Sequence, residues 1–125
     1  EKIRKDLISS GPSSASVEEK FLKQVISACE NNISDSAFNV EQLCSHVNVS
    51  QPHLYRKIKS LTDYSPFEFI RIIRLKKAAA LLLDNAGSVS EIAYRVGFND
   101  PKYFSKCFKS FFRTSPTDYK GKNQE

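Results

Sequence analysis

The feature that most constrains the fold of this 125-residue chain is an internal repeat. Residues 40–48 align with residues 89–97 at a shift of 49, and after one extra residue in the second copy the shift becomes 50. The pairs beyond that point include Leu54 with Phe104, Ile58 with Phe108, Lys59 with Lys109, and Ser65-Pro66 with Ser115-Pro116. Because apolar, basic and capping positions all match, the sequence predicts two copies of one structural unit.

Each copy has the pattern of two helices joined by a short turn. In the first copy, Asn39 caps a short helix and Ser50 caps a second helix from Gln51 to about Thr62. Asn48 lies between them, where a left-handed residue allows the chain to turn. In the second copy, Ser88 and Asp100 are the caps and Gly97 lies at the turn. Two helices joined in this way, the second one basic, are typical of a helix-turn-helix unit, although other helical corners share the pattern.

A long helix is predicted between the two copies. Ser65 is its cap, Pro66 occupies the first position, where no N–H is needed, and Glu68 completes a capping box. Apolar residues then recur mostly at three- and four-residue steps as far as Leu83. A helix from Ser65 to about Asp84 would be about 30 Å long.

These patterns predict an all-α fold with two helix-turn-helix subdomains joined by a long central helix, about seven helices in all. No run of alternating apolar residues predicts a sheet. The expected organisation is a serine-rich linker at 1–16, a first subdomain at 17–64, the connecting helix at 65–84 and a second subdomain at 85–122. A capping box of Ser16 and Glu19 begins the first subdomain with a supporting amphipathic helix.

Positive charge is concentrated in two blocks of the sequence. Residues 51–77 carry seven basic and two acidic side chains, and residues 99–122 carry six and two, whereas residues 1–50 carry five and seven. Each basic block contains the second helix of one copy. This alternation favours a nucleic-acid partner, and a solvated basic surface is the alternative that charge alone leaves open.

The second helix of each copy divides into two faces. Apolar residues at helical spacing predict a buried face, and polar residues occupy the other side. The polar face carries Gln51, Pro52, Tyr55, Arg56 and Lys59 in the first copy, and Lys102, Ser105, Lys106 and Lys109 in the second. Side chains near the start of such a helix can reach base edges, and those further along can reach phosphates, so these residues are the candidate DNA-binding set.

Residues 17–122 resemble the DNA-binding domain of the AraC/XylS family. The motifs that carry the resemblance are Leu54-Tyr55-Arg56-Lys57, Ser65-Pro66-Phe67-Glu68-Phe69-Ile70, Arg74-Leu75 with Ala78 and Leu81-Leu82-Leu83, Val89-Ser90-Glu91-Ile92-Ala93, Gly97 to Lys106, and Ser115-Pro116-Thr117-Asp118-Tyr119. The resemblance implies two helix-turn-helix units on a long helix, and a protein that activates transcription. It places base contacts at Gln51, Pro52, Tyr55 and Arg56 and at Lys102, Ser105 and Lys106.

The segment from Gly97 to Lys106 most resembles the output domain of hybrid two-component regulators. That resemblance implies receiver or sensor domains upstream in the same polypeptide, double-stranded DNA and RNA polymerase as partners, and a cytoplasmic location. The family often has glycine after each recognition helix, where this chain has Asp63 and Arg113. Arginine adopts the left-handed conformation at a cost of roughly 1 kcal/mol, so we expect the corner at Arg113 to be strained or re-shaped.

Other classes of function find little support in the sequence. There is no nucleophile paired with a base, no phosphate-binding loop and no cofactor motif, so neither an enzyme nor a cofactor is expected. Three cysteines and two histidines lack metal-ligand spacing, and no segment is long and apolar enough to cross a membrane. The alternative from another class is a helical protein–protein interaction module without sequence-specific DNA binding, which should show no DNA affinity at low salt.

Overall fold

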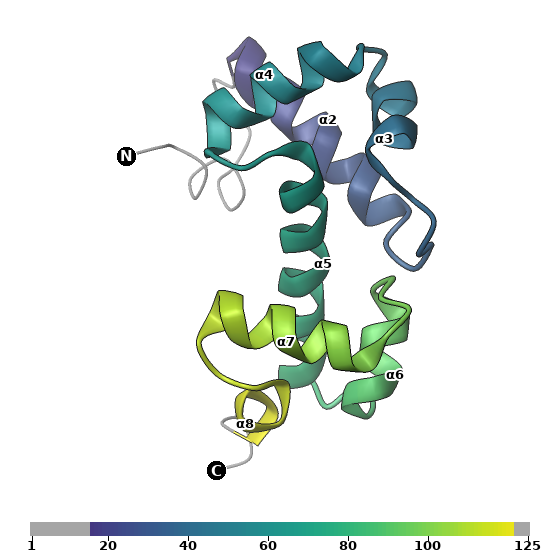
Figure 1. Cartoon of the computed structure of the whole chain (residues 1–125), viewed down its shortest axis with the longest axis vertical. Coiled ribbons are helices and arrows are strands. Elements are labelled where there is room, and N and C mark those ends of the chain that lie inside the picture. Colours follow the sequence, from purple (N-terminus) through teal and green to yellow (C-terminus); the bar gives the residue numbers. More distant parts are fainter. Residues whose placement is uncertain (1–15, 122–125) are drawn as a thin grey trace. The chain divides into compact units, whose positions relative to one another are not determined.

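The computed structural model describes residues 16–121 (Figure 1). Within that range the chain forms seven α-helices and no strand. They are α2 (Val17–Asn31), α3 (Val40–Val47), α4 (Gln51–Thr62), α5 (Pro66–Leu83), α6 (Val89–Arg95), α7 (Pro101–Phe112) and α8 (Pro116–Gly121). The all-α prediction is therefore confirmed, and the predicted linker lies, except for Ser16, outside the described residues.

The helices belong to two compact units, and the chain passes from the first to the second within α5, after Arg71. Unit 1 contains residues 16–32 and Phe38–Arg71. Unit 2 contains Ile33–Ala37 and residues 72–121, so a short segment between α2 and α3 belongs to the second unit. The predicted boundaries at 64/65 and 84/85 stay a prediction.

Unit 1 packs α2, α3 and α4 around a small apolar core (Figure 1). The side chains of Leu22, Val25, Leu43, Leu54 and Ile58 are fully buried. Local sequence fixes where these helices start, since capping boxes join Ser16 to Glu19 and Asn39 to Gln42.

The turn between α3 and α4 has the predicted left-handed residue. Asn48 has φ 60° and ψ 46°, and its N–H donates to the carbonyl oxygen of Cys44. Asparagine tolerates this conformation better than most residues because its short polar side chain can bond locally. The Ser50 hydroxyl then accepts the N–H of His53 at 3.2 Å and caps α4.

Unit 2 has an aromatic core. Phe104 and Phe108 are fully buried and Phe98 is 6% exposed, with ring centroids 5.1 Å apart for Phe98–Phe104 and 5.7 Å for Phe104–Phe108. Phe112 packs 4.5 Å from Phe108. These rings fill the unit's interior together with apolar residues of α5 and α6, which confirms that helical spacing here reflects core packing.

The second turn is two residues longer than the first, because its leading helix stops one residue earlier and the second copy has one extra residue. Val96, the partner of Val47 in the repeat, lies just outside α6, and the connection runs over residues 96–100 instead of 48–50. Gly97 has a φ of 95°, so its φ is positive, as that of Asn48 is. The predicted equivalence of the two turn residues is confirmed.

A buried arginine holds this turn in place. Arg74 of α5 is 7% exposed, and its Nη1 donates to the carbonyl oxygens of Ile33 at 2.5 Å and Val96 at 2.7 Å. Its Nη2 donates to the carbonyl oxygen of Asp35 at 3.0 Å. The guanidinium therefore joins three backbone segments of unit 2 and satisfies carbonyls near the end of α6.

The long helix α5 begins as predicted. The Ser65 N–H donates to Glu68 Oε1 at 2.9 Å, and the Glu68 N–H donates to Ser65 Oγ at 3.2 Å. Pro66 is the first helical residue and is buried.

Among the helices within residues 16–121, none is long and apolar enough to span a membrane.

Candidate nucleic-acid interface

The polar face of α4 is available to solvent. Leu54, Ile58 and Thr62 are each 0% exposed and direct one side of the helix inward. The predicted site residues lie on the other side, and all of them are exposed: Gln51, Pro52, Tyr55, Arg56 and Lys59. Tyr55 is 49% exposed, a large value for an aromatic side chain. The structure thus brings these five predicted residues together on one helix surface.

The polar face of α7 has the same arrangement. Phe104 and Phe108 hold the helix against the core of unit 2, while Lys102, Lys106 and Lys109 are exposed. Ser105 is half-buried at the edge of the face. A hydroxyl in that position can still donate to an acceptor, although it reaches less far than its basic neighbours.

Among the described residues, most of the cationic side chains on these faces have no hydrogen-bond or ion-pair partner. Within residues 16–121, the side chains of Arg56, Lys106 and Lys109 make no hydrogen bond or ion pair. Lys59 differs, because its Nζ donates to the backbone oxygen of Asp63 at 3.1 Å. Exposed cations without protein partners are suited to binding phosphates, where they displace counterions.

Capping fixes the start of each polar face. Ser50 caps α4, and Asp100 Oδ1 accepts the N–H of Lys102 at 3.0 Å at the start of α7. Each helix also has a proline in its first turn, at Pro52 and Pro101, where the missing N–H would have no intrahelical acceptor. Side chains in these first turns are therefore presented from a fixed backbone.

Both polar faces end at a left-handed residue, and of the two outcomes expected at Arg113, a strained or a re-shaped corner, the structure has the strained one. Asp63 has φ 71° and Arg113 has φ 65°, and their N–H groups donate to the oxygens of Lys59 and Lys109 at 2.9 Å and 2.8 Å. The two corners thus share one backbone geometry. Arginine retains the strain of that conformation, about 1 kcal/mol, and the helix end does not rearrange to relieve it.

A shallow surface hollow adjoins the end of α7. It is lined by Lys106, Lys109, Ser110 and Arg113. The sequence pattern had identified two of these residues as DNA-binding candidates and missed Ser110 and Arg113. The signal in the sequence is helical spacing, since Ser110 follows Lys106 by four residues and Arg113 follows Lys109 by four residues.

The basic residues of α5 have different roles from one another. Arg74 is buried and its guanidinium is bonded to backbone carbonyls, so its role is structural. The guanidinium of Arg71 lies 5.6 Å from the ring centroid of Phe67, and Lys76 Nζ lies 5.8 Å from that of Phe111. Lys77 is exposed.

The pKa shifts among the described residues arise from hydrogen bonds at helix caps and from burial. A hydrogen bond from the Ser65 N–H holds the pKa of Glu68 below its usual value, and one from the Ser88 N–H does the same for the pKa of Glu91. Burial, with a smaller contribution from the Glu41 charge, raises the pKa of the Cys44 thiol. In the part of the chain that is described, no three His, Cys, Asp or Glu side chains cluster as metal ligands would.

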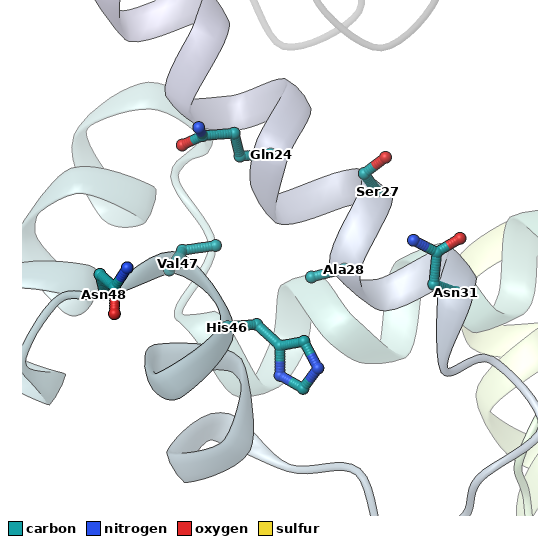
Figure 2. A pocket seen from close by; sticks show the side chains of 7 residues that line it. All are labelled: Gln24, Ser27, Ala28, Asn31, His46, Val47 and Asn48. Carbon is teal, nitrogen blue, oxygen red and sulfur yellow. The ribbon is translucent and has the colours of Figure 1, made fainter.

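A second hollow lies in unit 1, and its lining contains no Asp, Glu, Lys or Arg. Figure 2 shows the side chains around it, from α2, α3 and the turn after α3: Gln24, Ser27, Ala28, Asn31, His46, Val47 and Asn48. His46 Nδ1 is 2.9 Å from the carbonyl oxygen of Gln42, and its ring packs edge-on against Phe38. This histidine therefore has a local structural role.

Comparison with known proteins places the chain among DNA-binding regulators. A family model described as a helix-turn-helix domain matches residues 43–122. Histidine kinase P4 of Formosa agariphila is 41% identical over 111 residues, which are 89% of this chain and 8% of that protein. The chain therefore spans a small fraction of that curated relative's length.

Two solved structures have the same fold. The C-terminal domain of AraT, a response regulator from Geobacillus stearothermophilus, is 32% identical with a TM-score of 0.75, over 86% of this chain and 88% of that one. The DNA-binding domain of AdpA, a global transcriptional factor solved in complex with a target DNA, is 28% identical with a TM-score of 0.71, over 80% and 89%.

Proposed function

This chain belongs to the AraC-type helix-turn-helix family of DNA-binding transcription regulators, and from that premise we propose that it is the sequence-specific output domain of a larger transcription activator. The observation that carries the proposal is the pair of exposed polar faces on α4 and α7, each backed by a fully buried apolar face. Such a helix can enter the major groove while its other side stays in the core.

We assign base contacts to residues in the first half of each second helix. These are Gln51, Pro52, Tyr55 and Arg56 of α4 and Lys102, Ser105 and Lys106 of α7. An arginine or lysine there can donate to the O6 and N7 acceptors of guanine, and the amide of Gln51 suits adenine. Lys59 and Lys109 lie further along their helices and are assigned to phosphates.

The two second helices are proposed to occupy successive major grooves on one face of the duplex. The support is α5, which runs unbroken for 18 residues, or about 27 Å. Successive grooves on one face recur about every 34 Å, so bending of the duplex toward the protein would favour both contacts. On this proposal the chain holds two readers for one DNA site.

Regulation is proposed to come from outside this chain. The likeness to a histidine kinase and to the C-terminal domain of a response regulator supports upstream receiver or sensor domains in the same polypeptide. Contact with RNA polymerase is the means by which such an output domain would activate transcription. Both are proposals about the whole protein.

A selection from random duplex DNA followed by salt titration tests this function. The chain should enrich a defined sequence, and the log of its affinity should fall with log salt at a slope approaching −0.9 per phosphate contacted. Failure to bind any duplex at ~50 mM salt would contradict the proposal and favour the protein–protein interaction module, because non-specific DNA affinity is greatest at low salt.

A further inference from the structure

The second helices of the two units end on residues of opposite charge. Asp63 ends α4 and Arg113 ends α7, in the same left-handed conformation and with the same backbone hydrogen bond to the residue four positions earlier. Glycine adopts this conformation without strain, aspartate tolerates it and arginine does so least readily. The backbone therefore gives no reason for an arginine at position 113.

A strained residue that the backbone does not require points to a role for its side chain. Arg113 lines the surface hollow at the end of α7 together with Lys106, Lys109 and Ser110. Within residues 16–121, no hydrogen bond or ion pair occupies the side chains of Lys109 and Arg113. Three cations and a hydroxyl thus surround one hollow that contains no acidic group.

The matching positions of unit 1 have a different chemistry. At the repeat shift of 50, Lys109, Ser110 and Arg113 correspond to Lys59, Ser60 and Asp63. A carboxylate thus stands where unit 2 has a guanidinium, and Lys59 Nζ is bonded to the Asp63 backbone oxygen. This end of α4 is therefore less suited to an anion.

The occupant that fits the hollow is a phosphate group. A guanidinium can donate two parallel hydrogen bonds to phosphate oxygens, and the lysines and the hydroxyl add further donors. A helix of 12 residues is about 18 Å long, whereas the major groove is about 12 Å wide, so a helix whose start reads bases reaches the groove wall at its end. A backbone phosphate is what it would meet there.

We propose that the hollow lined by Lys106, Lys109, Ser110 and Arg113 is a DNA-phosphate site that unit 1 lacks. This inference rests on the proposed DNA-binding function. It makes the two readers unequal, since unit 2 supplies more of the sequence-independent affinity than unit 1 does.

Replacing each left-handed residue by glycine provides a matched test. R113G and D63G both relieve backbone strain, so each variant should melt at a temperature equal to or above that of the unaltered chain. Affinity for a random duplex is then measured by fluorescence anisotropy over a range of salt. R113G should bind about tenfold more weakly, with a salt slope shallower by ~0.9, whereas D63G should keep the original slope.

The reciprocal variant D63R should create the missing site and steepen the slope by ~0.9. An R113G protein that is folded and retains the original slope and affinity would overturn the phosphate site while leaving the proposed function intact. A marked fall in the melting temperature of R113G would also overturn it, because Arg113 would then be structural. If the unaltered chain binds no duplex, the proposed function itself fails.

Discussion

Arg74 Nη1 donates a 2.7 Å hydrogen bond to the carbonyl oxygen of Val96, which lies at the end of α6 and opens the turn into α7. The same nitrogen donates to the carbonyl oxygen of Ile33, and Nη2 donates to that of Asp35. One buried side chain thus holds the segment Ile33–Ala37 and the helix-turn-helix corner of unit 2 against α5. The orientation of α7 depends on that corner.

Replacing Arg74 should therefore destabilise unit 2. R74A leaves the carbonyl oxygens of Ile33, Asp35 and Val96 without this donor, and we expect it to lower the free energy of unfolding by about 3 kcal/mol. The free energy of unfolding of R74K should lie between those of the unaltered chain and R74A, because one ammonium group cannot reproduce the forked donors of a guanidinium. Urea unfolding measures the change. The control is K77A on the exposed face of α5, whose free energy of unfolding should lie within about 0.5 kcal/mol of that of the unaltered chain. If R74A changed the free energy of unfolding as little as K77A does, the anchoring role of Arg74 would be contradicted.

Gly97 should tolerate no side chain. Its φ of 95° is unfavourable for any other residue, and an added Cβ would overlap Arg74 Nη1 and lie 2.5 Å from the Ile33 carbonyl oxygen. We expect G97A to lower the free energy of unfolding by at least about 3 kcal/mol. G121A is the matched control, because a Cβ there would meet no atom of the described residues within 4 Å beyond its chain neighbours and its own helix backbone. Similar unfolding curves for the two variants would show that the turn can rearrange.

Features set by neighbouring residues could be predicted from the sequence. The caps at Ser16, Asn39 and Ser88 each depend on a partner three residues away, and the left-handed turn at Asn48 depends on the residue's own backbone preference. The exposed faces of α4 and α7 followed from helical periodicity, since apolar residues at three- and four-residue steps determine which side is buried.

Features set by distant contacts could not be predicted. The acceptors of Arg74 lie 41, 39 and 22 residues away along the chain, so its burial has no local signal. In a basic stretch beside Lys76 and Lys77 it looks like one more exposed cation. The hollow beside Arg113 depends on where α7 ends and on how its side chains are grouped, neither of which a sequence pattern specifies.

Acid should weaken the helix starts that depend on carboxylates. Hydrogen bonds from backbone N–H groups lower the pKa of Glu68 and Glu91 below 4.5 in the folded chain. The stabilisation is therefore fully present above the unfolded value and is lost as the pH falls through the folded pKa. Glutamine already serves in the Asn39–Gln42 capping box, where Gln42 Oε1 accepts the Asn39 N–H at 3.2 Å.

The double variant E68Q/E91Q tests this pH dependence. Its free energy of unfolding should fall less between pH ~5 and ~3 than that of the unaltered chain, because neither glutamine titrates. Urea unfolding at each pH provides the comparison. A parallel fall in both proteins would assign the acid sensitivity to other carboxylates.

The order of residues along each second helix should divide specificity from general affinity. R56A and K106A should each weaken binding to the selected sequence by about 1–3 kcal/mol and relax the preference for it. K59A should weaken binding to all sequences about equally, because a phosphate contact carries no sequence information. Competition between selected and random duplexes measures both quantities. If R56A lowered the two affinities by one factor, the assignment of Arg56 to a base edge would be wrong.

The site bound by one chain should be bipartite and asymmetric. The two polar faces differ chemically, since Gln51, Tyr55 and Arg56 correspond to Pro101, Ser105 and Lys106 in the repeat. Two readers in successive grooves should therefore protect two unrelated blocks about 10 base pairs apart. Hydroxyl-radical footprinting on the selected sequence should show both blocks on one face of the duplex.

Changing the spacing between the blocks tests the model further. Inserting 5 base pairs turns the second block to the opposite face of the duplex, so affinity should fall toward that of a single block. In footprints of the variants, R56A should weaken the protection of one block more than that of the other, and K106A should do the reverse. The reason is that each residue belongs to a different reader. A palindromic minimal site, or a footprint confined to one groove, would contradict two readers in one chain and assign recognition to a single unit.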